Sequence, residues 1–454
     1  MADLQEVRVP ARSPDVLAPV IGAARTARMR HQARAARDLL DGRTVWNLNT
    51  TAAGGGVAEM LHVLLAYAVG GGVRTRWLVI NGSPEFFVLT KRLHNRLHGV
   101  PGDDGQLGEA ERGVYEGVLA DQVPDLLGTG GARSGDIVLL HDPQTAGLAG
   151  ALRDAGLAVV WRCHVGSDLE NDQTREAWSF LRPYLDAPQA TVFSREEYVP
   201  AWLRGPAAWT IPPSIDPLSA KNRELSAEEQ RRFREEVLAE ADLVEGRPIP
   251  AEARVVLQVS RWDRLKDMSG VMTAFADHIA PAGDAHLVLA GPAVSGVADD
   301  PEGAAVRDEC IAQFNELAPA MQERVHLASL PMGDVTANAL MVNALQRHAA
   351  VVVQKSLVEG FGLTASEAMW KARPVVVSAA GGLADQVVDG RTGRVVADPA
   401  DLAAFGAAVN DLLADPGAAA RLGQAARQRV IEEYLPDRHL SQYVDLFGTI
   451  LGLG

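Results

Sequence analysis

Cysteine is scarce in this chain, because only Cys163 and Cys310 occur among its 454 residues. Neither belongs to a CxxC motif or stands at ligand spacing from a histidine, so the sequence indicates neither a disulfide framework nor a structural zinc site. A run of about 18 apolar residues, which a membrane span requires, is also missing, as is the basic and apolar start of a secretory signal. We therefore expect a soluble protein of the cytoplasm.

Positive charge is in deficit as well, since 43 lysines and arginines face 58 aspartates and glutamates, for a formal net charge of -15. A nucleic acid or an anionic membrane would require a basic face on its partner. The charge balance argues against both partners and favours small molecules, for which a local basic pocket is enough. A homodimer stays open as the state of assembly.

The length and composition are those of a globular protein with two domains, since 47% of the residues are hydrophobic and 454 residues exceed one ordinary core. The stretch 212–250 contains PPSIDPLSAKN and then a highly charged run, before apolar segments resume at Arg254. We expect an N-terminal domain of residues 1–216, a C-terminal domain of residues 217–435, and a last helix, 436–454, that crosses back to the N-terminal domain.

Short apolar runs alternate with helical stretches in both halves, which is typical of βαβ units on a parallel sheet. The predicted strands are TVWNLN, RWLVI, DIVLLHD, LAVVWRCHV and ATVFS in the first half, and RVVLQVS, HLVLAGP, RVHLAS, AAVVVQ and RPVVVS in the second. The predicted fold class is therefore α/β, with two Rossmann-like, doubly wound domains. Because such sheets bind ligands beyond the carboxyl ends of their strands, we expect a central cleft that two such edges face.

A glycine-rich turn, Gly54-Gly55-Gly56, separates the first predicted strand from an amphipathic helix. Without side chains, its backbone N–H groups can approach a phosphate or a sugar, and the start of the helix favours an anion. The turn lacks the spacing of a dinucleotide fingerprint or a P-loop. A plain turn requirement for glycine is the alternative.

Polar residues also follow two later strands of the first half, in His141-Asp142-Pro143-Gln144 and in Arg162-Cys163-His164. Sugar recognition requires directed donors and acceptors, so His164 could bind a sugar hydroxyl and Asp142 could accept from one. A core histidine with satisfied hydrogen bonds and a capping aspartate are the alternatives.

Two cations, Arg261 and Lys266, follow a strand of the second half in SRWDRLKD. An arginine binds phosphate oxygens in a fork, whereas a lysine acts as a compact charge, so the pair suits a diphosphate. Cations that face a leaving diphosphate stabilise the transition state more than the ground state. Exposed surface charge is the alternative.

The segment 354–370, QKSLVEGFGLTASEAMW, is the most informative, because a strand leads into a glycine-rich loop and then a helix. Glu359 lies in the loop and Glu367 lies about one turn inside the helix, so both carboxylates can point to the strand ends. Glu367 could accept from ribose hydroxyls and Glu359 from a hexose hydroxyl. The alternative for Glu367 is a favourable interaction with the helix dipole.

Taken together and in this order, these segments resemble the family 4 retaining glycosyltransferases of GT-B architecture. The family signature is two glutamates separated by seven residues around a GFG-type loop, which here reads EGFGLTASE. The resemblance covers roughly residues 44–435. Within the family, VWNLNTTAAGGGVAEMLH, HDPQTAGL and WRCHVG are similar to the trehalose synthases that use a nucleotide diphosphate glucose, and to the related trehalose phosphorylases.

The resemblance implies an acceptor-side N-terminal domain and a C-terminal domain that binds the nucleotide sugar donor. It implies no cofactor and no metal. The residues implied in catalysis are Arg261, Lys266, Glu359 and His164. Those implied on the donor are Gly54, Gly55, Gly56, Gly360, Phe361, Gly362, Leu363 and Glu367. Those implied on the acceptor are Lys91, His94, Asn95, Asp142 and Arg162.

The reaction implied by the resemblance is transfer of glucose, with retention, from a nucleotide diphosphate glucose to glucose or a glucose-like acceptor, which forms trehalose or a related α-glycoside. Phosphorolysis of trehalose by inorganic phosphate is the alternative in the same class of enzyme. A nucleotide-sugar epimerase and a non-catalytic nucleotide-sugar-binding protein are alternatives from other classes. The products formed with and without an acceptor distinguish them.

Overall fold

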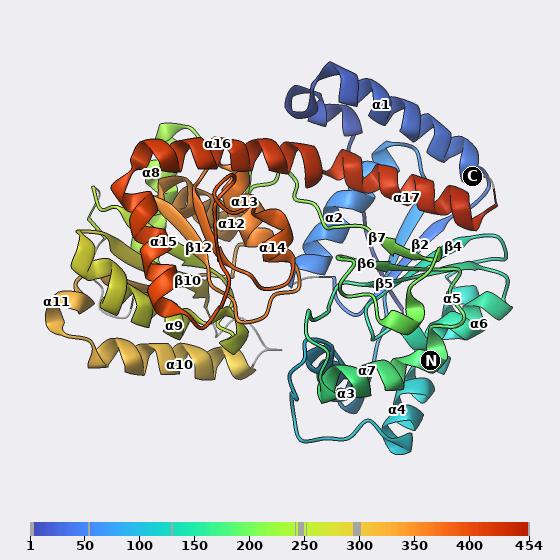
Figure 1. The fold of residues 1–454 in the computed structure, drawn as a ribbon. Helices are drawn as coiled ribbons and strands as arrows, with labels where there is room; N and C mark the ends of the chain where they lie inside the picture. Colours follow the sequence, from blue (N-terminus) through green and yellow to red (C-terminus); the bar gives the residue numbers. More distant parts are fainter. Residues whose placement is uncertain are drawn as a thin grey trace. The chain divides into compact units, whose positions relative to one another are not determined.

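A computed structural model describes residues 4–52, 55–128, 130–240, 242–243, 249–250, 252–293 and 301–452. The chain divides into two compact units, which we call unit 1 (Met1–Ser214 and Tyr434–Gly454) and unit 2 (Ile215–Glu433). Each unit is built on one seven-stranded sheet with helices around it (Figure 1). The α/β fold class predicted from the sequence is therefore confirmed.

The sheet of unit 1 is parallel except for β1, which pairs with β3 in the antiparallel sense at one edge. Its central strands are buried on both faces, which explains their continuous apolar runs. From edge to edge, the strands are β1 (Gln5–Val7), β3 (Thr75–Val79), β2 (Val45–Asn49), β4 (Ile137–His141), β5 (Ala158–Cys163), β6 (Ala190–Phe193) and β7 (Ala208–Thr210). The strand order reverses between β2 and β4, which makes the carboxyl ends of these two strands a topological switch point.

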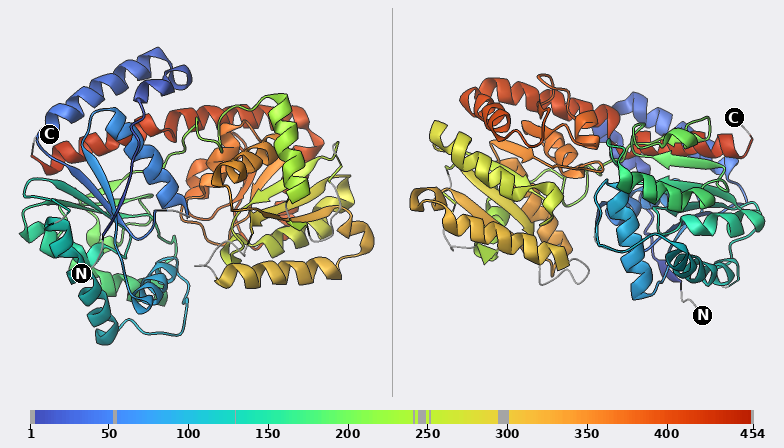
Figure 2. Two further views of the ribbon diagram at one scale, coloured as in Figure 1. Left: turned by 180° about the vertical axis from the view of Figure 1, so that it is seen from behind. Right: turned by 60° about the horizontal axis from the view of Figure 1, so that its bottom comes forward.

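Helices cover both faces of the unit 1 sheet (Figure 1). One face packs on α3 to α7, and the other packs on α17, where Tyr443 and Leu446 meet Val160 and Val192. Figure 2 shows α1 beside α17 from two further directions. The helices of unit 1 are α1 (Ala18–Leu39), α2 (Gly55–Gly70), α3 (Pro84–Leu97), α4 (Glu109–Ala120), α5 (Gln122–Leu127), α6 (Ala149–Asp154), α7 (Asp172–Leu181) and α17 (Pro436–Ile450).

The sheet of unit 2 repeats this design, with parallel strands and one short antiparallel edge strand, β8. From edge to edge, its strands are β14 (Arg394–Val396), β13 (Val375–Ser378), β12 (Val351–Gln354), β9 (Val255–Val259), β10 (His286–Pro292), β11 (Val325–Leu330) and β8 (Asp242–Leu243). The order reverses between β9 and β12, so the loops that follow these two strands lie side by side at the carboxyl edge.

The helices of unit 2 also form two layers. On one face, Met272, Phe275, Phe314 and Val409, from α9, α10, α15 and the turn after α9, pack on the sheet. α8, α12 and α13 cover the other face (Figure 1). The helices of unit 2 are α8 (Ala227–Glu240), α9 (Met268–Ala274), α10 (Pro301–Glu316), α11 (Pro319–Gln322), α12 (Val335–His348), α13 (Leu363–Trp370), α14 (Gly382–Gln386), α15 (Leu402–Ala414) and α16 (Pro416–Glu433).

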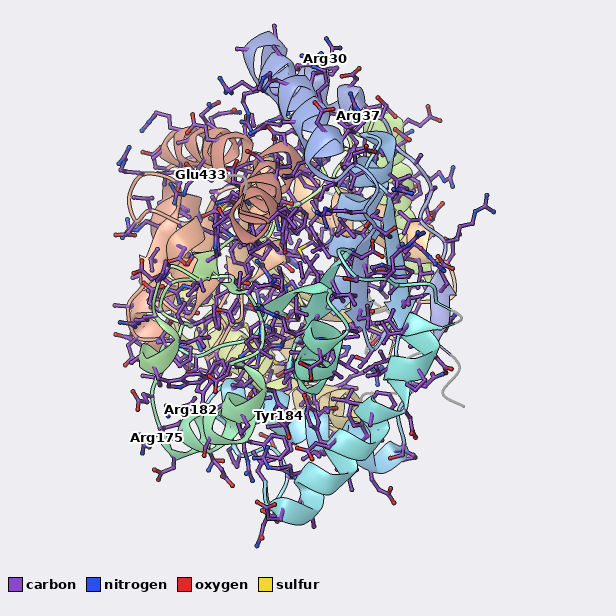
Figure 3. The ribbon with its side chains drawn as sticks, turned by 90° about the vertical axis from the view of Figure 1, so that its right-hand side faces the viewer. Arg30, Arg37, Arg175, Arg182, Tyr184 and Glu433 are labelled. Carbon is purple, nitrogen blue, oxygen red and sulfur yellow. The ribbon has the colours of Figure 1, made fainter. Side chains whose placement is uncertain are left out.

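Four surface arginines of unit 1 each contact a different protein group. Figure 3 labels Arg30 and Arg37 on α1, and Arg175 and Arg182 on and just after α7. Arg30 pairs with Asp15 at 2.8 Å and Arg175 pairs with its helix neighbour Asp172. Arg37 donates to the Gly71 carbonyl, and Arg182 lies over the Trp202 ring. Within the described residues, none of the helices has both the length and the apolar composition of a bilayer span.

Candidate active site

The loop after β9 carries the two predicted cations and is held in a fixed shape by two aspartates. Asp263 Oδ1 accepts from the Leu265 N–H at 2.8 Å, which caps the short helical turn Arg264–Lys266. Asp267 adopts a left-handed conformation, with φ of 50°, and caps α9 by accepting from the Gly270 N–H at 3.0 Å. Lys266 therefore stands at a defined bend between two capped helical turns.

The loop after β12 is bound to this cation loop through backbone and amide groups. The Leu357 N–H donates to the Leu265 carbonyl at 2.8 Å. Gln258 bridges the two loops, because its amide donates to the Lys266 carbonyl at 2.7 Å and accepts from the Lys355 N–H at 3.0 Å. The adjacency of β9 and β12 thus places residues almost one hundred positions apart in sequence in one constellation.

Lys266 and Glu359 meet in this constellation. Lys266 Nζ lies 2.7 Å from Glu359 Oε1, and the second carboxylate oxygen accepts from the Ser356 hydroxyl at 3.1 Å. The two side chains are 16% and 9% exposed, so the pair is mostly shielded from solvent. A second ion pair, between the buried Lys355 and Asp267, lies directly beside it. The structure therefore brings together two of the predicted catalytic residues.

Arg261 lies at the surface of the same loop. Its side chain is 54% exposed, and Nη2 lies 3.3 Å from Asp263 Oδ2. Since Asp263 also caps the turn that carries Lys266, one carboxylate orients both predicted cations. An exposed guanidinium and a shielded ammonium on one loop suit an anion that arrives from solvent.

Gly362 starts α13 and carries the loop into the helix. Its φ is +84°, and a Cβ atom at this position would lie 2.5 Å from the Leu383 side chain, so only glycine fits. The side chain of Gln386, on α14, donates to the carbonyls of Phe361 and Gly362. Phe361 is buried, whereas Gly360 and Leu363 are partly exposed. The predicted donor-binding backbone is thus supported from α14.

Glu367 lies one turn inside α13 and is 8% exposed. Lys221 Nζ lies 3.6 Å from its carboxylate. Lys371, one turn further along α13, is fully enclosed and donates to Asn222 Oδ1, to Gln346 Oε1 and to the Glu367 carbonyl. Burial lowers the pKa of Lys371, although the Glu367 carboxylate acts in the opposite direction. Lys221 therefore contacts the carboxylate of Glu367, whereas Lys371 bonds to its main-chain carbonyl.

In unit 1, the glycine-rich turn precedes α2. Gly55 and Gly56 form the first turn of α2, and Gly55 has φ of +79° with open space where a side chain would be. Gly54 lies outside the described residues. The described part of the turn therefore leaves room for a ligand next to the start of the helix.

Asp142 and His164 meet at the carboxyl ends of β4 and β5. Asp142 has φ of +65°, and its Oδ1 accepts from the His164 N–H at 2.7 Å. Burial raises the pKa of Asp142 to about 7. Arg162 is fully buried, and its nitrogens donate to Ser194 Oγ at 3.4 Å and to His164 Nδ1 at 3.5 Å. In this structure the contacts of Arg162 are therefore with protein groups.

The three remaining acceptor-side residues lie on α3. Lys91 is exposed, and His94 and Asn95 are partly buried one turn later. The His94 ring packs against that of His98, whose Nδ1 lies 3.0 Å from the Gly166 carbonyl. The end of α3 is therefore attached to the loop that carries His164, while Lys91 points to solvent on the same helix.

Sequence reasoning missed several residues that hold the site in place. Gln258, Lys355 and Gln386 are buried polar residues that tie the two unit 2 loops and α14 together. Lys371 could have been noticed, because it follows Glu367 by four positions on one helix and such pairs face each other. The others carry no local signal, since their partners are distant in sequence.

The ionisation of Asp142 predicts that both kcat/KM and folding stability depend on pH. If its carboxylate accepts from an acceptor hydroxyl, kcat/KM for the acceptor should rise about tenfold per pH unit up to pH 7 and level off above it, because the ionised form is the better acceptor. The raised pKa also means that folding stability is lost as pH rises from the ordinary aspartate range through about 7. Initial rates at fixed donor concentration measure the first effect, and thermal melts measure the second.

Asp142→Asn is the control for this prediction, because it keeps the shape and removes the ionisation. It should flatten both profiles and lower kcat/KM at pH 8. A wild-type profile that is flat between pH 5.5 and 8, or a rise that survives in Asp142→Asn, would assign the ionisation to another group such as Lys371.

Comparison with known proteins identifies relatives that match both halves of the chain. A family model described as "Trehalose synthase, N-terminal domain" matches residues 47–200, and one described as "Glycosyl transferases group 1" matches residues 241–429. A trehalose synthase from Rubrobacter xylanophilus is 35% identical over 426 residues, which cover 91% of this chain and 92% of that protein. A trehalose phosphorylase from Pleurotus pulmonarius is 26% identical over 412 residues, which cover 85% of this chain and 54% of that protein.

Among solved structures, the sucrose-phosphate synthase of Thermosynechococcus elongatus is similar, with a TM-score of 0.67 at 18% identity. The alignment covers 91% of this chain and 100% of that one. At this identity the likeness concerns the fold, and the GT-B class expected from the sequence is confirmed. The 35% identity to the Rubrobacter xylanophilus protein over 91% of this chain shows the family. The chain therefore belongs to the trehalose synthase family and is a glycosyl-transferring enzyme.

Proposed function

We propose that this enzyme transfers glucose from a nucleotide diphosphate glucose to glucose or a glucose-like acceptor with retention of configuration, forming trehalose or a related α-glycoside. The observation that carries this proposal is the contact between Lys266 and Glu359 beside Arg261, at the carboxyl ends of β9 and β12. A donor with a diphosphate and a neutral sugar requires both cations and carboxylates in one place. This constellation offers both.

In the proposed reaction, the bond between the anomeric carbon of glucose and the diphosphate oxygen breaks, and the electron pair leaves with the phosphate. Arg261 and Lys266 stabilise the negative charge that develops there. The acceptor hydroxyl oxygen bonds to the anomeric carbon on the face that the phosphate leaves, and its proton passes to a phosphate oxygen. No side-chain nucleophile takes part, so retention results from same-face attack.

The carboxylates and the loop backbone have separate roles in this proposal. Glu359 binds a hydroxyl of the transferred glucose, and its contact with Lys266 aligns it with the phosphate-binding cation. Glu367 binds the ribose hydroxyls, while Lys221, 3.6 Å from its carboxylate, orients it. The turn at Gly360, Phe361, Gly362 and Leu363 offers its backbone to the donor.

The unit 1 residues complete the proposal. His164 binds a hydroxyl of the sugar substrate, and Asp142 accepts from a hydroxyl of the acceptor. Gly54 to Gly56 border the donor through their backbone, and Lys91, His94 and Asn95 on α3 border the acceptor. Arg162 acts on the acceptor through His164, because it is itself fully buried.

Phosphorolysis of trehalose is the second candidate reaction. The similarity of this chain to a trehalose phosphorylase supports it. Arg261 and Lys266 could hold inorganic phosphate as well as a diphosphate, because both ligands present the same oxygens. In glucosyl transfer a nucleoside diphosphate leaves the anomeric carbon, whereas in phosphorolysis inorganic phosphate attacks it. Only one of them requires a nucleotide.

The deciding experiment is a panel of nucleoside diphosphate glucoses with different bases, each incubated with labelled glucose. We expect a non-reducing disaccharide in which NMR couplings identify two α linkages, and no product when the nucleotide is omitted. A parallel incubation of glucose 1-phosphate with glucose tests phosphorolysis in reverse. Hydrolysed donor as the sole product across the whole panel would contradict transfer to a sugar acceptor.

Metal independence is a further expectation of this proposal. Since Arg261 and Lys266 supply the positive charge at the diphosphate, we expect kcat to change less than twofold after dialysis against a chelator. Rates with and without added magnesium measure this. A loss of activity that magnesium restores would show that the two cations are insufficient and that a metal shares their role.

A further inference from the structure

His141 lies behind His164 and bonds to it directly. His141 Nδ1 lies 3.1 Å from His164 Nε2, and the two rings are nearly parallel, at 16°, with centroids 5.4 Å apart. The other nitrogen of His141, Nε2, lies 3.2 Å from Asn47 Oδ1. His141 and Asn47 are both buried, at 2% exposure each, whereas His164 is partly exposed. Two buried residues therefore support His164, which is itself partly exposed.

The position of each hydrogen in this chain follows from its inner end. The Thr75 hydroxyl donates to the Val45 carbonyl at 2.9 Å, so its oxygen accepts from Asn47 Nδ2 at 3.3 Å. This orients the amide of Asn47 with Oδ1 towards His141, and an oxygen can only accept. His141 must therefore carry its hydrogen on Nε2, which leaves Nδ1 as an acceptor for a hydrogen on His164 Nε2.

Arg162, which contacts the other ring nitrogen of His164, requires the same tautomer of His164. Its Nε carries a hydrogen at every pH and points at His164 Nδ1 from 3.5 Å, so Nδ1 must present a lone pair. Two independent neighbours, His141 and Arg162, thus select one tautomer of His164. An imidazole nitrogen has one lone pair, so a substrate hydroxyl that donates to Nδ1 takes the place of Arg162, whose 3.5 Å contact is the longest of the chain.

We propose that Asn47 and His141 are positioning residues that lock His164 in the tautomer with its hydrogen on Nε2, so that Nδ1 accepts a hydrogen bond from a hydroxyl of the sugar substrate. This inference rests on the proposed role of His164 in binding sugar. It adds the direction of that bond and names the two residues that decide it. Neither Asn47 nor His141 touches substrate in this scheme.

The surroundings keep the chain neutral. Burial, with a smaller effect from Arg162, lowers the pKa of His141 to about 3 and that of His164 well below its ordinary value. The neighbouring groups that lower these pKa values are Arg162 and His439, and Asp142 accepts from the His164 backbone N–H. A cavity of about 110 Å³ on the inner side of Asn47 and His141 is lined mainly by apolar side chains of α1, α2 and α17. The pair therefore keeps its partners throughout the neutral pH range.

The first test removes the inner acceptor. Asn47→Leu leaves His141 Nε2 without a partner, frees the tautomer of both rings, and should lower kcat/KM roughly 10- to 100-fold, as for other partners that orient a site histidine. The decrease in kcat/KM should come from a higher KM for the sugar whose hydroxyl binds to His164. Asn47→Asp restores an acceptor oxygen and should recover most of the activity at pH 7. Equal activity of wild type and Asn47→Leu would overturn the proposal.

A matched control exists in unit 2, where His286 and His326 form a pair with the same 3.1 Å contact and nearly parallel rings on β10 and β11. This second pair lies at the amino ends of its strands, away from the carboxyl ends that carry the candidate site. His326→Gln breaks the pair and should leave the kinetics unchanged. If His326→Gln and Asn47→Leu reduce kcat/KM equally, the effect is one of general stability and the positioning role is wrong.

Two further measurements test the direction of the bond. In ¹⁵N-histidine spectra, assigned with His141→Gln and His164→Gln, wild-type His164 should be protonated on Nε2, and Asn47→Leu should give a mixture of tautomers. Donor and acceptor analogues with hydrogen or fluorine in place of one sugar hydroxyl should lose affinity equally at one position of one of the two sugars, because fluorine cannot donate. Retained affinity of the fluoro analogue, or a proton on His164 Nδ1, would overturn the proposal. The spectra need no turnover, so they separate this inference from failure of the proposed reaction.

Discussion

Replacing Lys266 by methionine is expected to reduce kcat about 100- to 1000-fold, the size found when one group that stabilises a developing negative charge is removed. Methionine keeps the length of the side chain and loses the ammonium that lies 2.7 Å from Glu359 Oε1. The effect should fall on kcat more than on the donor KM, because charge on the diphosphate grows as the glycosidic bond breaks. Initial rates over a range of donor concentrations separate the two.

Stability should change little in the same variant. Glu359 retains its contact with Ser356, so the free energy of unfolding should fall by about 1–2 kcal/mol. Arg264→Met is the matched control, because Arg264 lies two positions before Lys266 but is 57% exposed and pairs with Glu309 at 2.6 Å. Equal kinetic losses in the two variants would mean that Lys266 contributes only to the general charge of the loop.

Replacing Glu359 by glutamine is the second change for which we expect a large effect, a loss of about 100-fold in kcat/KM. Glutamine keeps an oxygen for Lys266 and a group that can bond to Ser356, so the loop remains closed. It removes the negative charge that, in the proposed reaction, faces the transferred sugar, where positive charge develops as the phosphate leaves. Steady-state kinetics with donor and acceptor varied in turn measure the loss.

A double-mutant cycle with Lys266→Met makes this prediction sharper. Because the two side chains touch, their effects on kcat/KM should fall short of additivity. Glu309→Gln is the control, since Glu309 is an exposed carboxylate of the same unit that pairs with Arg264. A thermal melt that falls in step with kcat/KM in Glu359→Gln would assign Glu359 a structural role instead.

Much of the fold could be predicted from local patterns. The apolar runs that we assigned to strands appear as β2, β3, β4, β5 and β6 in unit 1 and β9 to β13 in unit 2. The edge strands β1, β7, β8 and β14 were not predicted, because they are only two or three residues long. A short strand at an edge depends on pairing with its neighbour rather than on its own apolar pattern.

The candidate site could be predicted as a set of residues but not as a set of contacts. Strand-end logic singled out Lys266 and Glu359 separately, and their contact depends on β9 and β12 being neighbours in the sheet. Strand order is set by which face each connecting helix packs on, which a single sequence does not state. For the same reason, the bond between His141 and His164 could not be expected, although both histidines were noted at the ends of strands.

The sequence by itself determined the residue types that this chemistry requires and their places at strand ends, because the alternation of apolar runs, glycine turns and polar residues is local information. The left-handed turn at Gly362, where a Cβ atom would lie 2.5 Å from Leu383, was visible only in the structure. Only the tertiary structure decided which groups neutralise and orient one another, as Lys266 does for Glu359 and His141 for His164. The physical reason is that hydrogen bonds and ion pairs act over about 3 Å, and at that range the packing of distant segments, rather than their order along the chain, chooses the partners.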